Sequence, residues 1–190
     1  RGMNPFRAMD MPLESVVAGL TGEYESRGTA KDADCVIGFS FGYRGSGNHV
    51  SPGLSNEDLA QVALHHYAGL PKILQFEVAD AYCAAGAADC AKVMRITKHR
   101  KKGKYLDTRE VAWQARTLMK QHGYKKAVLL AHPYHMPRVQ MSCDELGIDW
   151  VATDDLRGAV EFDPMSAQKW TRGLEQWRGY EPLALLFYRM

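Results

Sequence analysis

Residues 128–138, with the sequence VLLAHPYHMPR, decide the fold class of this chain. The apolar run at their start is typical of a strand buried on both faces, and Pro137 suits the first turn of a following helix. His132, His135 and Arg138 lie at that strand-to-helix junction. Because ligands bind at the carboxyl ends of strands in open parallel sheets, the stretch predicts both a parallel sheet and a functional site.

The same alternation of short apolar runs and helical patterns extends along the chain. Strands are predicted at residues 35–39, 72–78, 127–131 and 149–152, with a further short strand at 93–97. Helical spacing of apolar residues separates these runs, and right-handed crossovers place such strands in one parallel sheet. We therefore expect a single α/β domain over residues 1–190, with a three-layer α/β/α architecture.

Capping residues indicate where several helices begin and end. Ser55 with Asp58 predicts one helix start, and Asp107 with Glu110 predicts another, whose helix ends at Gly123. Further helices are predicted over residues 80–92, from Met136 to Gly147, and in the C-terminal part with an interruption at Pro182.

Composition narrows the classes of protein that fit. With 190 residues and 46% hydrophobic side chains, the chain can bury one full core, and 24% charged residues make intrinsic disorder unexpected. The net charge is only +2, so the basic run at residues 98–104 is interpreted as a solvated segment and no nucleic-acid binding is expected. No apolar run is long enough for a membrane span.

The four cysteines point to a reducing environment. Cys35, Cys83, Cys90 and Cys143 form no CxxC pair and have apolar neighbours. Buried free thiols are the expectation for such residues, which predicts a cytoplasmic setting.

A glycine-rich loop, residues 40–53, follows the first predicted strand. Glycines let backbone N–H groups approach an anion, and arginine can clamp a phosphate or carboxylate. The candidate ligand-binding residues in this loop are Ser40, Gly42, Arg44, Gly45, Gly47 and Asn48. Their spacing matches neither GxGxxG nor GxxxxGK[ST], and the alternative is a flexible surface loop that needs glycine for its turns.

A second group of candidates surrounds the strand-to-helix junction. His135 is the candidate proton-transferring residue, and Glu110 would position it or contact a ribose or amine of the ligand. Thr108, His132 and Arg138 complete the expected ligand contacts. Alternatively, a histidine bonds the backbone at the turn, Arg138 pairs with a carboxylate and Glu110 caps its helix. No metal is expected, since His-x-x-His supplies only two ligands and Arg138 would repel a cation.

These residues resemble the motifs of the DUF218 family, which includes the YdcF-like, SanA-like and ElyC-like proteins. Residues 131–139 are similar to the motif T-S-x-x-H-x-x-R-A, with His135 and Arg138 matching and His132 and Val139 departing. Residues 108–112, TREVA, resemble T-x-E-N-A with a valine in place of the asparagine. Residues 36–42 resemble the family's hydrophobic run into a glycine-rich turn, without its consecutive glycines. The resemblance covers roughly residues 33–153.

The resemblance implies a Rossmann-like fold whose motifs converge at the strand carboxyl ends. One branch of the family is reported to bind S-adenosylmethionine. Envelope-linked members generally carry an N-terminal membrane anchor, and its absence from this sequence favours the soluble, ligand-binding branch. We therefore expect binding of a small anionic or nucleotide-like ligand, either S-adenosylmethionine or a phosphorylated metabolite, with acid/base-assisted hydrolysis or group transfer.

The rival expectation is a non-catalytic ligand-sensing or interaction module, linked to cell-envelope maintenance. It would use the same pocket, and the aromatic-rich C-terminal helix would serve as a partner or homodimer surface rather than simply covering the core.

Overall fold

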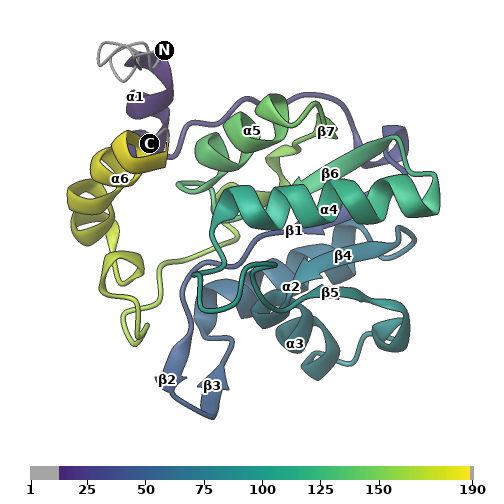
Figure 1. Cartoon of the computed structure of the whole chain (residues 1–190), viewed down its shortest axis with the longest axis horizontal. Coiled ribbons are helices and arrows are strands. Elements are labelled where there is room, and N and C mark those ends of the chain that lie inside the picture. The colour runs from purple at the N-terminus through teal and green to yellow at the C-terminus, as the bar shows by residue number, and fades with distance from the viewer. Residues whose placement is uncertain (1–12, 189–190) are drawn as a thin grey trace.

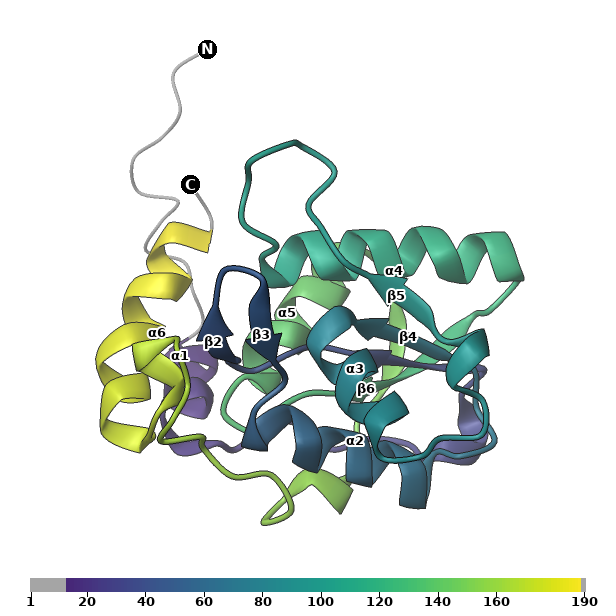
Figure 2. The same ribbon diagram turned by 90° about the horizontal axis from the view of Figure 1, so that it is seen from below.

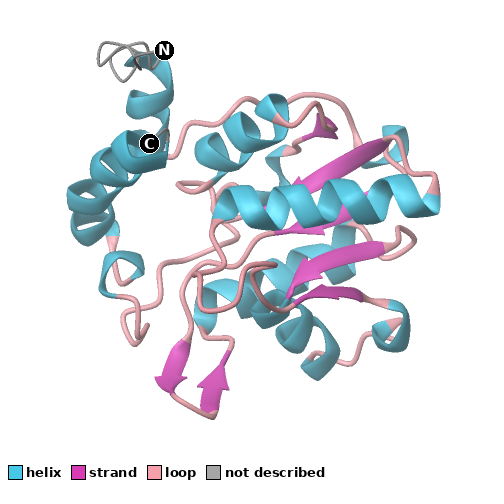
Figure 3. Cartoon of the chain, in the orientation of Figure 1, coloured by secondary structure: helices cyan, strands magenta, loops and turns pink. Residues whose placement is uncertain are grey.

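The computed structural model describes residues 13–188, with side chains up to residue 186, as an α/β fold built on a five-stranded parallel sheet (Figures 1 and 3). The strands lie in the order β5-β4-β1-β6-β7. Their bounds are β1 Cys35–Gly38, β4 Lys72–Gln75, β5 Met94–Ile96, β6 Lys126–Leu130 and β7 Asp149–Val151. This is a Rossmann-like order, with the first strand in the middle and later strands added on both sides.

The apolar side chains of the central strands explain why these strands lie in the middle of the sheet. In the middle of the sheet, Ile37 of β1 lies beside Ile73 of β4 and Leu129 of β6, and all three side chains are buried. Strands that are apolar on both faces need a helical layer on each side. The parallel pairing predicted for the four main runs and the short strand near residues 93–97 are both confirmed.

Helices form the two outer layers. Their bounds are α1 Leu13–Thr21, α2 Leu54–His66, α3 Phe76–Ala84, α4 Thr108–His122, α5 Met136–Glu145 and α6 Leu174–Tyr188. Helices α4 and α5 pack together on one face of the sheet, and α2 and α3 pack together on the other (Figure 2). Helices α1 and α6 lie side by side beyond α5. None of the helices within residues 13–188 is long and apolar enough to cross a bilayer.

The second predicted strand was too long. It ends at Gln75, and the rest of the predicted run forms the first turn of α3. A short apolar run does not distinguish a buried strand from a buried helix, so the apolar pattern held no signal for the change from strand to helix at Phe76. The helix predicted over residues 80–92 is also wrong in its end, because α3 stops at Ala84.

The predicted capping role of Ser55 is wrong as well. Helix α2 begins at Leu54, whose backbone N–H donates to the carboxylate of Asp163 at 3.0 Å. Ser55 and Asp58 instead bind the backbone of Glu161, as donor and acceptor respectively. The cap comes from a residue 109 positions away, so local sequence held no signal for it.

Two further expectations are corrected. The glycine-rich loop contains an antiparallel hairpin, β2 (Arg44–Ser46) and β3 (His49–Ser51), and is therefore not structureless. Helix α6 continues through Pro182 without interruption. The proline removes one backbone hydrogen bond from α6, which packs against α1.

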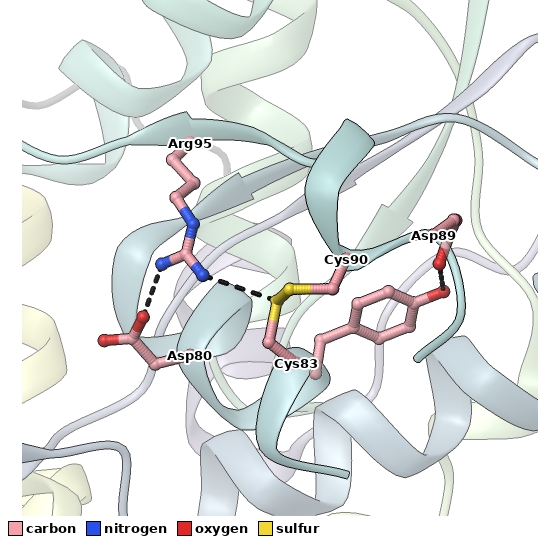
Figure 4. The surroundings of a disulfide bond; sticks show 6 residues. Asp80, Cys83, Asp89, Cys90 and Arg95 are labelled. Carbon is pink, nitrogen blue, oxygen red and sulfur yellow. Dashed lines mark hydrogen bonds and ion pairs between the residues drawn. A yellow bond between two sulfur atoms is a disulfide. The ribbon is translucent and has the colours of Figure 1, made fainter. Parts of the chain in front are cut away.

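The cysteines depart most from expectation. Cys83 and Cys90 form a disulfide between the end of α3 and the turn before β5 (Figure 4), whereas Cys35 and Cys143 are buried free thiols as predicted. Arg95 bonds both Asp80 and the sulfur of Cys83, and the hydroxyl of Tyr82 donates to Asp89 at 2.8 Å. Disulfides are typical of oxidising compartments, so the expectation of a cytoplasmic setting loses the support it drew from the thiols.

Reducing the Cys83–Cys90 bond is expected to lower the free energy of unfolding by about 2 kcal/mol. The bond joins residues seven positions apart, and closing so short a loop removes a modest amount of entropy from the unfolded chain. Urea unfolding with and without a phosphine reductant measures the effect. A Cys83→Ser, Cys90→Ser double variant should be insensitive to the reductant. Titration of four free thiols in unreduced, denatured protein would contradict the bond.

Candidate functional site

The carboxyl ends of β1 and β6 lie side by side at the centre of the sheet. From β1 the chain leads to α2 on one face, and from β6 it leads to α5 on the other. This divergence is the topological switch point, where α/β folds of this kind bind their ligands. Ser40 and His132 each lie two residues beyond the end of their strand, at this edge.

A cavity of about 480 Å³ lies at this edge of the sheet. Its walls come from the turn after β1, the start of α4, the start of α5 and the segment leading through α6. They comprise Ser40, Phe41, Gly42, Gln75, Tyr105, Leu106, Asp107, Thr108, Arg109, His135, Arg138, Gln168, Trp170, Thr171, Trp177, Tyr180, Leu183 and Ala184. Each of the three predicted motifs therefore contributes part of its residues to this cavity: Ser40 and Gly42, Thr108, and His135 with Arg138.

His135 and Thr108 form the polar floor of the cavity. His135 precedes α5, Thr108 is the first residue of α4, and Nε2 of His135 lies 2.9 Å from Oγ1 of Thr108. Burial, and then the nearby Arg138 and His132, hold the pKa of His135 well below its usual range. The imidazole is therefore neutral at physiological pH. Its Nδ1 has no hydrogen-bond partner within residues 13–188.

His132 does not line the cavity but packs against Phe41, which does. Its ring stacks on Phe41 with centroids 4.0 Å apart, and its Nδ1 accepts a hydrogen bond from the backbone N–H of Tyr134 at 3.2 Å. Burial lowers the pKa of His132 to about 3. A neutral ring that accepts through Nδ1 carries its proton on Nε2, and that atom is buried without a partner in the described structure.

Arg138 brings a positive charge to the cavity wall. Its side chain is 13% exposed, and Nε lies 3.2 Å from Oε1 of Glu181 on α6, although the two atoms are not aligned for a hydrogen bond. Burial raises the pKa of Glu181 to about 7 against the opposing influence of Arg138. The guanidinium also lies 5.6 Å from the ring centre of Trp177. None of the described residues accepts a hydrogen bond from Arg138.

Glu110 lies apart from the cavity. It is buried, and its carboxylate accepts hydrogen bonds from Arg100 at 2.8 and 2.9 Å and from Gln114 at 2.9 Å. Burial alone would raise the pKa of Glu110, but the bonds from Arg100 and Gln114 outweigh it and lower that pKa to about 2. The helix cap is Asp107, which accepts from the backbone of Glu110. Glu110 thus anchors the loop before α4, and it makes no described contact with His135.

Replacing Glu110 with glutamine is expected to lower the free energy of unfolding by about 1–2 kcal/mol at pH 7, since charge-assisted hydrogen bonds become neutral ones and half-exposed Arg100 is partly screened. The loss should shrink as the pH falls from 4.5 towards 2, because Glu110 itself becomes protonated there. Urea unfolding at several pH values measures both effects. Exposed Glu145 provides the control, Glu145→Gln; equal stability of the two variants would contradict an anchoring role.

The glycine-rich loop divides between two places. Gly42 has a φ of +72°, and a Cβ there would lie 2.5 Å from the hydroxyl oxygens of Ser166 and Thr171, so only glycine lets the loop pass so close to this segment. Arg44 is held by a two-point ion pair with Asp163 at 2.8 Å. Gly45 and Gly47 line a second, neighbouring cavity, and exposed Asn48 lines neither.

Sequence reasoning missed the contribution of the C-terminal segment. Glu181, Trp177 and Asp163 contact Arg138, Phe41 and Arg44 across the fold. The clustering of aromatic residues near the C-terminus was the available signal for this wall. Nothing in the local pattern around Glu181 pairs it with an arginine 43 positions earlier.

No group of three His, Cys, Asp or Glu side chains within residues 13–188 is arranged to hold a metal ion. Comparison of the chain with protein-family models, curated proteins and solved structures finds no match. The resemblance to the DUF218 family therefore rests on the motif residues alone and stays a prediction.

Proposed function

We propose that this protein binds a small ligand carrying a phosphate or carboxylate group in the cavity at the carboxyl edge of the sheet. The observation that carries the proposal is Arg138, a cation on the cavity wall whose hydrogen-bonding capacity no described residue uses. Arginine can present two parallel N–H donors to such a group. Thr108, which also lines the cavity, adds a further hydrogen-bonding group through its hydroxyl.

Aromatic side chains favour a ligand that also has a flat ring. Trp170 stacks on Tyr180 with centroids 4.7 Å apart, and both line the cavity with Trp177 and Tyr105. Such faces stack on bases and similar rings. This supports a nucleotide-like ligand, and S-adenosylmethionine, which has both an adenine and a carboxylate, is the leading candidate from the family resemblance. A phosphorylated metabolite is the other.

Calorimetric titration with S-adenosylmethionine, adenosine and inorganic phosphate tests this proposal, alongside mass spectrometry of any small molecule that co-purifies with the native protein. We expect an anion-bearing probe to bind, and S-adenosylmethionine to bind more tightly than adenosine if its carboxylate reaches Arg138. Failure of every anionic probe to bind at millimolar concentration, with nothing co-purifying, would refute the proposal.

A second candidate function is hydrolysis or group transfer at the Thr108–His135 pair. The 2.9 Å contact between a hydroxyl and an imidazole inside a cavity is a nucleophile-and-base arrangement. Two observations weaken it: no described carboxylate orients His135, and the lowered pKa makes the imidazole a poor proton acceptor near pH 7. Binding without turnover, as in a ligand-sensing module, is therefore the function that the site supports best.

The two functions differ in turnover. An enzyme acting through Thr108 would hydrolyse p-nitrophenyl phosphate or p-nitrophenyl acetate, lose that activity in Thr108→Val, and keep part of it in Thr108→Ser. A binding module would show no turnover above buffer in any of the three proteins while still binding an anionic ligand.

A further inference from the structure

A second cavity, of about 580 Å³, opens beside the first. It lies between the hairpin β2–β3 and the loop that joins β5 to α4, which project on the same side of the molecule (Figure 2). Both cavities are lined by Gln75, Tyr105, Leu106 and Gln168. These shared walls make the two cavities neighbouring parts of one surface depression.

One hydrogen bond crosses the boundary between the cavities. The side-chain amide of Gln168 donates to the hydroxyl of Tyr105 at 3.0 Å, joining the loop before α4 to the segment before α6. Tyr105 is 66% exposed, so this contact lies on the outside of the boundary. A hydrogen bond between an exposed and a half-buried side chain contributes little to stability and is easily exchanged for a bond to a ligand.

Glu77 is the distinctive residue of the second cavity. The residue is only 6% exposed although it lines the cavity wall, and its Oε2 has no hydrogen-bond partner within residues 13–188. Burial raises the pKa of Glu77 to about 7 despite the opposing influence of its own backbone N–H and the Ser40 hydroxyl. Leaving a buried carboxyl oxygen without a donor costs free energy, and a donor group on a bound ligand would recover it.

The surroundings of Glu77 connect it to the first cavity. The Ser40 hydroxyl, which lowers the pKa of the Glu77 carboxyl group, belongs to a residue that lines the first cavity. Gln75, two residues before Glu77, lines both cavities. Lys98 and Lys104 are exposed residues of the second cavity's lining, so its outer part carries positive charge while its inner wall carries the acid.

We propose that the two cavities are subsites of one cleft, in which Arg138 receives the anionic group of a ligand and Glu77 receives a hydrogen-bond donor, a hydroxyl or an ammonium group, at the other end of the same molecule. The anion subsite at Arg138 rests on the proposed function. The donor subsite at Glu77 adds the class of ligand: a molecule with an anion at one end and a hydrogen-bond donor at the other. Gln75 and the Tyr105–Gln168 bridge lie where such a ligand passes from one subsite to the other.

Three matched series of probes test the proposal: alkyl phosphates, ω-hydroxyalkyl phosphates and ω-aminoalkyl phosphates, with chains of about two to about eight carbons. Calorimetry should find one chain length at which a donor-terminated phosphate binds the wild-type protein about tenfold more tightly than the methyl-terminated phosphate of equal length. The hydroxyl and amino series then distinguish the two kinds of donor. In Glu77→Gln that advantage should fall below about twofold for the charged probe.

The control variant is Glu57→Gln. Glu57 lies in the first turn of α2 as Glu77 lies in the first turn of α3, but it lines neither cavity, so the donor advantage should persist. Equal affinity of the three series at every length, or an unchanged advantage in Glu77→Gln, would overturn the two-subsite proposal while leaving anion binding intact. Absence of binding by every phosphate would instead overturn the proposed function and this extension together.

Discussion

Replacing Arg138 with lysine is expected to weaken binding of an anionic ligand about tenfold to a hundredfold. The positive charge is kept, but an ammonium group cannot reproduce the planar two-point geometry of the guanidinium. A charge-assisted hydrogen bond contributes roughly 1.5–3 kcal/mol, which corresponds to that range of affinity. Titration of both proteins with the probe that the wild type binds best measures the change.

Arg138 also forms an ion pair with Glu181, so the melting temperature of each variant is the control for this experiment. Because Arg138 is only 13% exposed and Glu181 is buried beside it, Arg138→Met should lower the melting temperature at pH 8, where Glu181 is charged. The deficit should shrink below about pH 6, where Glu181 is protonated. Arg138→Lys, with its cation retained, should melt close to the wild type. If Arg138→Lys lost stability but kept full affinity, Arg138 would be a structural residue.

Acidification from pH 6.5 to about 4 is expected to cost the fold about 3 kcal/mol through His132 alone. Burial lowers the pKa of this ring from 6.5 to about 3. Between these two pH values the histidine binds a proton in the unfolded chain but not in the folded protein. Its contribution is complete above pH 6.5 and is lost as the pH falls towards 3. At 1.36 kcal/mol per pKa unit, about 2.5 units give the stated loss.

The comparison with His132→Phe isolates this contribution, because phenylalanine keeps the ring against Phe41 without the titrating nitrogens. Glu77 and Glu181, whose pKa values are raised to about 7, act in the opposite direction as the pH falls from 7 to 4.5, but they do so in both proteins. Urea unfolding across this pH range should therefore show a flatter loss on acidification in His132→Phe. His65→Asn, at an exposed position on α2, should leave the wild-type slope unchanged.

Short-range patterns were sufficient to predict the sheet and the location of the cavity. The apolar runs indicate which segments form buried strands, and the polar residues after β1 and β6 mark the strand ends that carry candidate site residues, since both signals depend on neighbours in sequence. What failed depends on contacts across the fold. Asp163 caps α2 from 109 positions away, and Glu181 reaches Arg138 from α6. The Arg100–Glu110 pair and the Cys83–Cys90 bond are closer in sequence, but they depend on how the loop before α4 folds and on where α3 ends.

The order of synthesis determines when the cavity is complete, because the C-terminal segment forms one of its walls. Gly42 lies against the side chains of Ser166 and Thr171. The indole N–H of Trp177 donates a hydrogen bond to the backbone carbonyl of Gly19, and its ring packs near Phe41. A nascent chain ending at residue 153 already contains all five parallel strands and both junction histidines, yet it lacks an entire wall of the cavity. Binding of the proposed ligand would therefore require α6 to have been made and docked, because the cavity lacks one wall before then.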